Sequence, residues 1–224
     1  TGYLNGGRMW NDTLLGIIHN WQKDAIDLRD WGIPLIAMTT AAERQKAWKA
    51  LFRWMRRIGI RGRDEMLARL QAVVERPLPD DLMMTTEHVR MLHAEGMGIG
   101  CHTDTHPILT RVTDAIVREE ITRSRSYLED SIQAPVRYFA YPNGVPEDDY
   151  SRQHVEIVKE LGFEAAFSTA WGAARPSSDM FQLPRFTPWD RSSPEFALRL
   201  ILSRRAEGYP QAAKLFRAAA EAET

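Results

Sequence analysis

Apolar residues recur every three or four positions in the first third of the chain, which is the spacing of one face of a helix. The pattern predicts three helices, one from near Thr13 through Trp21, one carrying Ala47, Leu51, Trp54 and Met55, and one over residues 64–74. Residues able to cap the first two precede them: Asn11 or Asp12, and then Thr39 or Thr40. A short extended segment is expected at residues 31–36. Because Pro77 and Pro79 interrupt the pattern, we interpret residues 13–80 as a helical insertion.

Beyond Thr85 the pattern changes to helices that alternate with short apolar segments. Helices are predicted at residues 86–96, 114–132, 150–162, 194–203 and 210–222, and strands at 97–101, 136–141, 164–168 and 181–186. Alternation of this kind is typical of parallel β/α units. The sequence therefore predicts an α/β sheet or barrel, in which functional residues gather beyond the carboxyl ends of the strands.

The composition fits one domain over residues 1–224 with a single sizeable core. The chain has 224 residues, 44% of them hydrophobic, and a formal net charge of −1. This balance does not indicate a nucleic-acid partner, and no run approaches the ~18 apolar residues of a membrane span. Cys101 is the only cysteine, which excludes an intrachain disulfide. Cytoplasmic and periplasmic locations both stay open, and because the chain opens at Thr1 without methionine we expect functional residues upstream.

The strongest candidate for chemistry is the segment Met97–Pro107, in which His102 and His106 stand four residues apart. Neutral imidazoles are the commonest side-chain ligands of zinc and similar ions. Glycines before the first histidine allow a tight backbone, and Pro107 blocks continuation of a helix. We interpret the segment as a strand that ends in a turn and directs two imidazoles toward one metal ion. Histidines are also common as hydrogen-bonded core residues, so the spacing alone leaves both interpretations open.

The sequence His102-Thr-Asp-Thr-His106, with its glycine-rich lead-in, resembles the second motif of the polysaccharide deacetylases of the NodB-homology type (carbohydrate esterase 4). Ala140-Tyr-Pro-Asn-Gly144 is similar to their third motif, and residues 1–12 resemble a segment of exopolysaccharide-linked members. The resemblance covers roughly half of the chain. It implies a distorted (β/α) barrel that lacks its first strands here and carries the helical insertion. It also implies a divalent metal ion, with zinc favoured and cobalt or nickel as alternatives.

The same resemblance implies roles for individual residues. His102 and His106 would be metal ligands, and the backbone N–H of Asn143 would donate to the oxyanion. Arg185 stands in the late region where the family has a Leu-x-His motif, and we assign it an electrostatic role in catalysis. Substrate contacts are expected from the turn and from two aromatic rings that could instead pack in the core: Tyr141, Pro142, Gly144 and Trp171.

Three departures from the family pattern limit what this chain can supply. The first motif, Thr-Phe-Asp-Asp-Gly, which carries the general base and the third metal ligand, would precede Thr1. The arginine of the third motif is Ala140 here, and no Leu-x-His follows His154. Asp104 lies between the two histidines, but on a tight turn we expect its side chain to point elsewhere.

The function expected is metal-dependent hydrolysis of N-acetyl groups on amino sugars of a bacterial polysaccharide, with an N-acetylated oligo- or polysaccharide as the partner. This chain by itself is expected to be poorly active, because the base and one ligand lie outside it. Two alternatives stay open: a carbohydrate-binding relic of the same fold, and a metal-dependent amidohydrolase that acts on a small molecule. An Asp-Asp pair before Thr1 would favour the enzyme over the relic.

Overall fold

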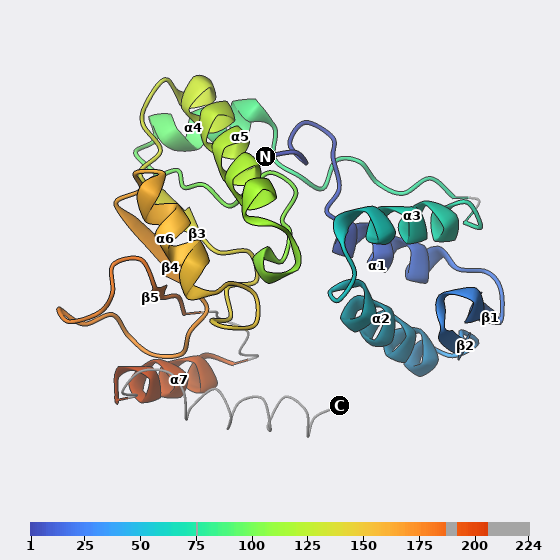
Figure 1. The fold of residues 1–224 in the computed structure, drawn as a ribbon. Helices are drawn as coiled ribbons and strands as arrows, with labels where there is room; N and C mark the ends of the chain where they lie inside the picture. The colour runs from blue at the N-terminus through green and yellow to red at the C-terminus, as the bar shows by residue number, and fades with distance from the viewer. Residues whose placement is uncertain (75, 187–191, 206–224) are drawn as a thin grey trace. The chain divides into compact units, whose positions relative to one another are not determined.

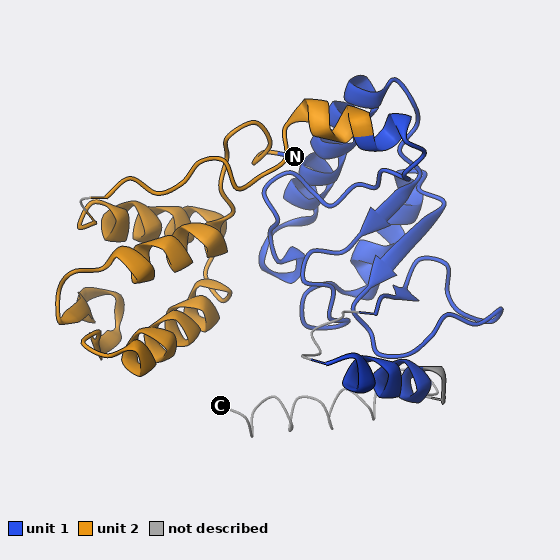
Figure 2. Cartoon of the chain, turned by 180° about the vertical axis from the view of Figure 1, so that it is seen from behind, with its two compact units in different colours: residues 1, 92–224 blue, residues 2–91 orange. Residues whose placement is uncertain are grey.

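The structure is a computed structural model that describes residues 1–74, 76–186 and 192–205. Its contacts divide the chain into two compact units, one of residues 2–91 and one of Thr1 with residues 92–224 (Figure 2). The assignment of all 224 residues to one domain stays a prediction.

The unit of residues 2–91 combines helices with a two-stranded hairpin. In chain order its elements are α1 (Trp10–Asn20), β1 (Ala25–Leu28), the 3-10 turn η1 (Arg29–Trp31), β2 (Ile33–Ala37), α2 (Ala41–Met55) and α3 (Ile60–Gln71), as labelled in Figure 1. The two strands pair antiparallel. α1 packs against α2 and α3, and the apolar side chains between them form one core that includes Leu14, Ile17, Leu51 and Met66. Tertiary packing of this kind contributes most of the stability of short helices.

Tertiary packing moves the start of α1 and adds a strand that the sequence pattern did not reveal. The helix begins at Trp10 instead of near Thr13, so Asn11 and Asp12 lie inside its first turn and neither caps it. Trp10 is 5% exposed and its ring stacks on Phe52 with 5.0 Å between the centroids. The helix therefore starts without a side-chain cap, at the residue whose ring is buried in the core. β1 was not expected, because a strand of four residues carries too little periodicity to be recognised.

Other expectations for this unit are confirmed. Thr40 caps α2: its hydroxyl accepts from the Glu43 N–H at 3.1 Å, and the Glu43 carboxylate accepts from the Thr40 N–H at 3.0 Å. The extended segment expected at residues 31–36 overlaps β2. The helix expected at residues 64–74 is α3, which begins and ends earlier. The segment interpreted as a helical insertion thus holds three helices and a hairpin.

The second unit contains a parallel sheet flanked by helices. Its elements are α4 (Thr86–Ala94, which begins in the first unit), the turn η2 (Leu109–Arg111), α5 (Asp114–Ile132), β3 (Tyr138–Ala140), α6 (Arg152–Glu160), β4 (Ala165–Ser168), β5 (Leu183–Pro184) and α7 (Ser193–Arg205). The strands lie in the order β3-β4-β5, all parallel, and Cys101 adds one parallel bridge to Phe139. α5 and α6 contact each other beside this sheet (Figure 1). The predicted α/β class is confirmed, and the part of the barrel that this chain covers is an open sheet.

The strand expected at residues 97–101 is reduced to one residue. The Cys101 N–H donates to the Tyr138 carbonyl at 2.8 Å, and the Cys101 carbonyl accepts from the Ala140 N–H at 2.9 Å. Gly100 passes close to β3, since a Cβ there would lie 3.3 Å from the Tyr138 carbonyl oxygen. Glycine weakens strands in general, because it has no side chain to pack. The segment before His102 is therefore joined to the sheet by a single β-bridge and not by a full strand.

The helices of this unit follow the prediction more closely than the strands do. Thr113 caps α5, since its hydroxyl accepts from the Ile116 N–H at 3.5 Å. α7 corresponds to the helix expected at residues 194–203, whereas the one expected at 210–222 lies outside the described residues. None of the helices described is both long and apolar enough to cross a membrane.

Candidate active site

The predicted site residues lie beyond the carboxyl ends of neighbouring parallel strands. His102 follows Cys101, Asn143 follows β3, Trp171 follows β4 and Arg185 follows β5. Since the strands run parallel, their carboxyl ends meet at one edge of the sheet. The fold therefore brings together segments that are far apart in the chain.

His102 uses one ring nitrogen to hold its position and leaves a lone pair on the other. Its Nδ1 lies 2.7 Å from the carbonyl oxygen of Ala140, the last residue of β3. A carbonyl oxygen can only accept, so the proton is assigned to Nδ1 and the lone pair to Nε2. Burial lowers the pKa of His102, and the nearby Arg185 cation lowers it further, although the bond to Ala140 acts in the opposite direction. The imidazole is therefore neutral at neutral pH, as a metal ligand must be.

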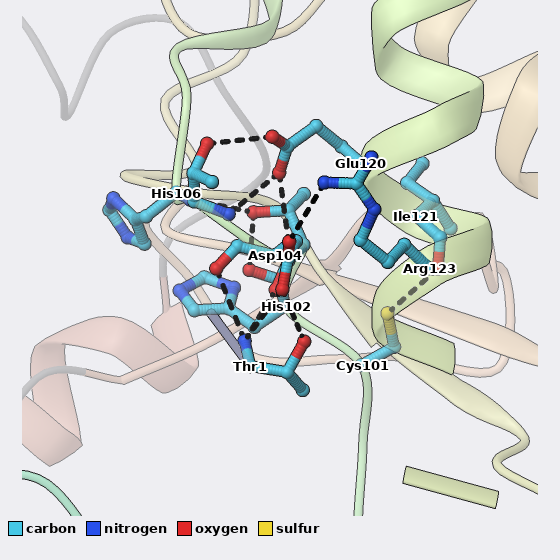
Figure 3. A network of polar contacts seen from close by, with 10 residues as sticks. Thr1, Cys101, His102, Asp104, His106, Glu120, Ile121 and Arg123 are labelled. Carbon is cyan, nitrogen blue, oxygen red and sulfur yellow. Dashed lines mark hydrogen bonds and ion pairs between the residues drawn. The ribbon is translucent and has the colours of Figure 1, made fainter. Parts of the chain in front are cut away.

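His106 lies beside His102, with 4.8 Å between the ring centroids and 74° between the ring planes (Figure 3). The loop between them is tight, because Thr103 and His106 adopt left-handed φ angles of 64° and 55°. The Thr103 hydroxyl accepts from the His106 N–H at 3.2 Å and donates to the His102 carbonyl at 2.6 Å. Each left-handed residue costs about 1–2 kcal/mol when it carries a side chain. Further hydrogen bonds are needed to hold this conformation.

Glu120 on α5 supplies such bonds, and the sequence analysis missed it. Its carboxylate accepts from the N–H of Asp104 (2.9 Å), from the N–H of Thr105 (2.7 Å) and from the Thr105 hydroxyl (2.6 Å). The residue is only 6% exposed. A signal was present in the sequence, because Glu120 shares the apolar face of its helix with Val117 and Ile121. A carboxylate on such a face needs buried donors.

The Asp104 carboxylate is engaged away from the histidine rings. One oxygen accepts from the Thr1 hydroxyl at 2.7 Å, and the other accepts from the Arg123 guanidinium at 3.4 Å. Across the described ranges, no group of three or more His, Cys, Asp or Glu side chains could hold a metal ion. His102 and His106 therefore fit a metal ion as two ligands of a larger set. The upstream aspartate expected as the third ligand stays a prediction.

The loop after β3 is held against the end of β4. Asn143 and Gly144 have left-handed φ angles of 57° and 80°. The Thr169 N–H donates to the Gly144 carbonyl at 2.8 Å, and the Thr169 hydroxyl donates to the Asn143 carbonyl at 2.9 Å. A Cβ on Gly144 would lie 3.0 Å from the Thr169 nitrogen, so this position requires glycine. No backbone carbonyl among the residues described accepts the Asn143 N–H, and its role as a donor to the oxyanion stays a prediction.

Tyr141 does not face a substrate, which corrects its expected role. The residue is 0% exposed, and its ring stacks on Tyr150 with 3.8 Å between the centroids. Its hydroxyl donates to the Phe181 carbonyl at 3.0 Å, and burial raises the pKa of Tyr141. A ring without accessible surface cannot stack on a sugar. Pro142 and Gly144 are also buried, whereas Asn143 between them is partly exposed.

Trp171 and Arg185 are accessible, as their expected roles require. Trp171 is partly exposed and lines a cavity of about 460 Å³, together with polar residues that include Arg175, Asp179 and Gln182. This volume is within the range of small-ligand pockets. Arg185 is exposed, and its charge acts on the pKa of His102 as described above. Their contacts with substrate stay predictions.

Residues 67–166 match the family model described as polysaccharide deacetylase. The matched segment runs from α3 into β4 and includes both histidines and the loop after β3. A comparison with curated proteins found no match.

Several solved structures of deacetylases are similar to part of the chain. The Streptococcus pyogenes deacetylase PplD in complex with acetate is 24% identical, with a TM-score of 0.47 over 52% of this chain and 50% of that one. The polysaccharide deacetylase BC0361 from Bacillus cereus is 20% identical, with a TM-score of 0.44 over 54% and 38%. IcaB from Ammonifex degensii is 24% identical, with a TM-score of 0.38 over 47% and 49%. The chain thus spans half or less of the length of these proteins.

Proposed function

We propose that this chain, whose residues 67–166 match the polysaccharide deacetylase family model, belongs to that family and hydrolyses N-acetyl groups on amino sugars of a bacterial polysaccharide with the help of a divalent metal ion. The reaction converts the N-acetyl group and water into acetate and a free amine. The observation that carries the proposal is the pair of imidazoles, in which a neutral His102 with its lone pair on Nε2 lies beside His106.

His102 and His106 would hold the ion, and we favour zinc over cobalt or nickel because neutral imidazoles are common ligands in catalytic zinc sites. When bound, such an ion lowers the pKa of a water molecule and polarises a carbonyl group. The third ligand and the general base would come from an Asp-Asp pair that precedes Thr1 in the full-length protein.

The loop after β3 is proposed to stabilise negative charge that develops on the acetyl oxygen. The Asn143 N–H would donate to that oxygen, and Thr169 holds the Asn143 carbonyl in place. A donor that is fixed before the reaction needs no reorganisation in the transition state. Arg185 would add positive charge at the same edge of the sheet, and Trp171 would stack on a sugar ring in the adjacent cavity.

The test is acetate release by the full-length protein from oligomers of N-acetylglucosamine. We expect a chelator to abolish release and added zinc to restore it. Substitution of either ligand, His102→Ala or His106→Ala, should lower the rate by more than about a hundredfold, which is the upper end of the effect of outer-shell substitutions. The matched control is His19→Ala, an exposed histidine on α1 that should leave the rate unchanged.

Other outcomes would identify the alternatives. Acetate release that no chelator affects would contradict the metal mechanism. Release from a monosaccharide or a cyclic amide, but not from oligomers, would indicate an amidohydrolase that acts on small molecules. Binding of oligomers without release from any substrate, in a protein that lacks an Asp-Asp pair before Thr1, would indicate a relic.

A further inference from the structure

The loop between the two histidines has a buried anchor on another element. We propose that Glu120 is a positioning residue that fixes the relative direction of the His102 and His106 rings. This inference rests on the proposed function of these two histidines as metal ligands.

The position of Glu120 is set by helix packing and not by the loop. Glu120 lies on the buried face of α5 together with Val117, Ile121 and Ser124. The same helix also contacts the start of the loop, because the Cys101 thiol donates to the Ile121 carbonyl at 3.7 Å (Figure 3). α5 therefore holds the segment of the histidines both before His102 and between the two rings.

The partners of the Glu120 carboxylate all belong to the loop. Its Oε2 accepts from two consecutive backbone N–H groups, those of Asp104 and Thr105, and its Oε1 accepts from the Thr105 hydroxyl. Arg123, which lies on the same helix, forms ion pairs with Glu119 and Asp104 instead. Ion pairs within the described part of the chain do not include Glu120. A carboxylate buried in this way is stable only while the loop supplies its donors.

The convergence of two neighbouring N–H groups on one oxygen requires a particular loop conformation. Thr103 and His106 flank this pair, and both have left-handed φ angles. Loss of the carboxylate would remove the acceptor that the Asp104 and Thr105 N–H groups share and the contact that offsets the strain. The direction of the His106 ring would then no longer be fixed relative to His102, which is anchored separately by Ala140.

The experiment compares Glu120→Ala, Glu120→Gln and Glu119→Ala in the full-length protein. Glu119 is the matched control, because it is the same residue type at the next position of α5 with a side chain that is 62% exposed. The readouts are the affinity and visible absorption of bound Co²⁺, the hydrogen exchange of the Asp104 and Thr105 amides, and thermal stability.

Glu120→Ala should weaken Co²⁺ binding by about 10- to 100-fold, change the absorption band and speed exchange of both amides. Glu120→Gln should stay within about threefold of the wild type, because its carbonyl oxygen can accept both N–H groups while its NH₂ donates to the Thr105 hydroxyl. Glu119→Ala should match the wild type in Co²⁺ affinity, absorption and amide exchange, and loss of its exposed ion pair with Arg123 should cost little thermal stability.

Wild-type Co²⁺ affinity and absorption in Glu120→Ala, even with reduced thermal stability, would overturn the proposal and make Glu120 a purely structural residue. Where Glu120→Ala does not fold, Glu120→Asp replaces it, since this change withdraws the carboxylate by one methylene and should cause the same losses. Failure of the proposed function looks different. The wild type would then take up no Co²⁺, although its Asp104 and Thr105 amides would be protected in the wild type and exposed in Glu120→Ala.

Discussion

At the scale of residues, the side chains at the edge of the sheet divide into those that line a cavity and those that support the loops from inside. Trp171 lines the open cavity after β4, whereas Tyr141, only one residue beyond β3, is wholly enclosed against Tyr150. Both are aromatic residues that follow a strand, and the sequence analysis assigned them the same role. Only their burial separates them.

This division predicts opposite effects for two substitutions. Tyr141→Phe should lower the free energy of unfolding by about 1 kcal/mol, because it removes the hydrogen bond to the Phe181 carbonyl, and should leave KM unchanged. Trp171→Ala should raise KM for an oligosaccharide by about 2- to 10-fold with little loss of stability, since it removes one stacking contact. Urea unfolding and acetate-release kinetics measure both, and an increased KM in Tyr141→Phe would show that the ring reaches the substrate.

At the scale of elements, two helices use histidine where a glutamate usually completes the cap. His154 Nδ1 accepts from the Ser151 N–H at 2.9 Å at the start of α6, and His88 Nδ1 accepts from the Thr85 N–H at 3.2 Å at the start of α4. The sequence analysis gave neither histidine a role. An imidazole can accept in this way only while the nitrogen is unprotonated, so the cap that His154 completes depends on pH.

The cap of α6 predicts a loss of stability in mild acid. Burial lowers the pKa of His154 in the folded state, although Asp114 acts in the opposite direction. The unfolded chain, with a histidine pKa of about 6.5, binds the proton more readily. The free energy of unfolding should therefore fall as pH decreases from about 6.5 to the lower pKa of folded His154, and this contribution ends below that pKa.

The measurement is urea unfolding at pH 7.5, 6.5 and 5.5. His154→Gln keeps an acceptor that does not titrate, so the variant should lose less stability between pH 6.5 and 5.5 than the wild type. His19→Gln, at an exposed position on α1, is the control and should keep the wild-type dependence. A slope in His154→Gln equal to that of the wild type would remove His154 as the cause.

At the scale of the whole molecule, the parallel order of the strands assembles the candidate site. Residues that follow Cys101, β3, β4 and β5 meet because each strand runs in the same direction as its neighbour. A metal ion held by such residues binds the folded state and not the unfolded chain. Binding is therefore linked to global stability.

This linkage predicts that zinc stabilises the full-length protein. At a free zinc concentration a hundredfold above Kd the gain should be about 2.7 kcal/mol, which for a domain of about 150–250 residues raises Tm by roughly 5–10 °C. His106→Ala should abolish the increase, and His19→Ala should retain it. Thermal unfolding with and without zinc is the measurement. An equal increase in His106→Ala would place the zinc elsewhere in the protein.

The sequence by itself determined the features that depend on residues close together in the chain. The spacing of His102 and His106, the cap at Thr40 and the alternation of helices with apolar segments are local patterns, and the structure contains each of them. A local pattern reports the geometry of one turn or one element, because that geometry is set by neighbouring residues.

Only the tertiary structure decided the features that depend on contacts between distant segments. The bonds from Glu120 to the histidine loop, the bond from Tyr141 to Phe181 and the start of α1 at Trp10 each need a partner that lies many residues away. Periodicity places a side chain on a face of its own element but does not state what covers that face. Packing of distant segments covers that face, and it thereby decides which polar groups bind the loop and which stay accessible to solvent.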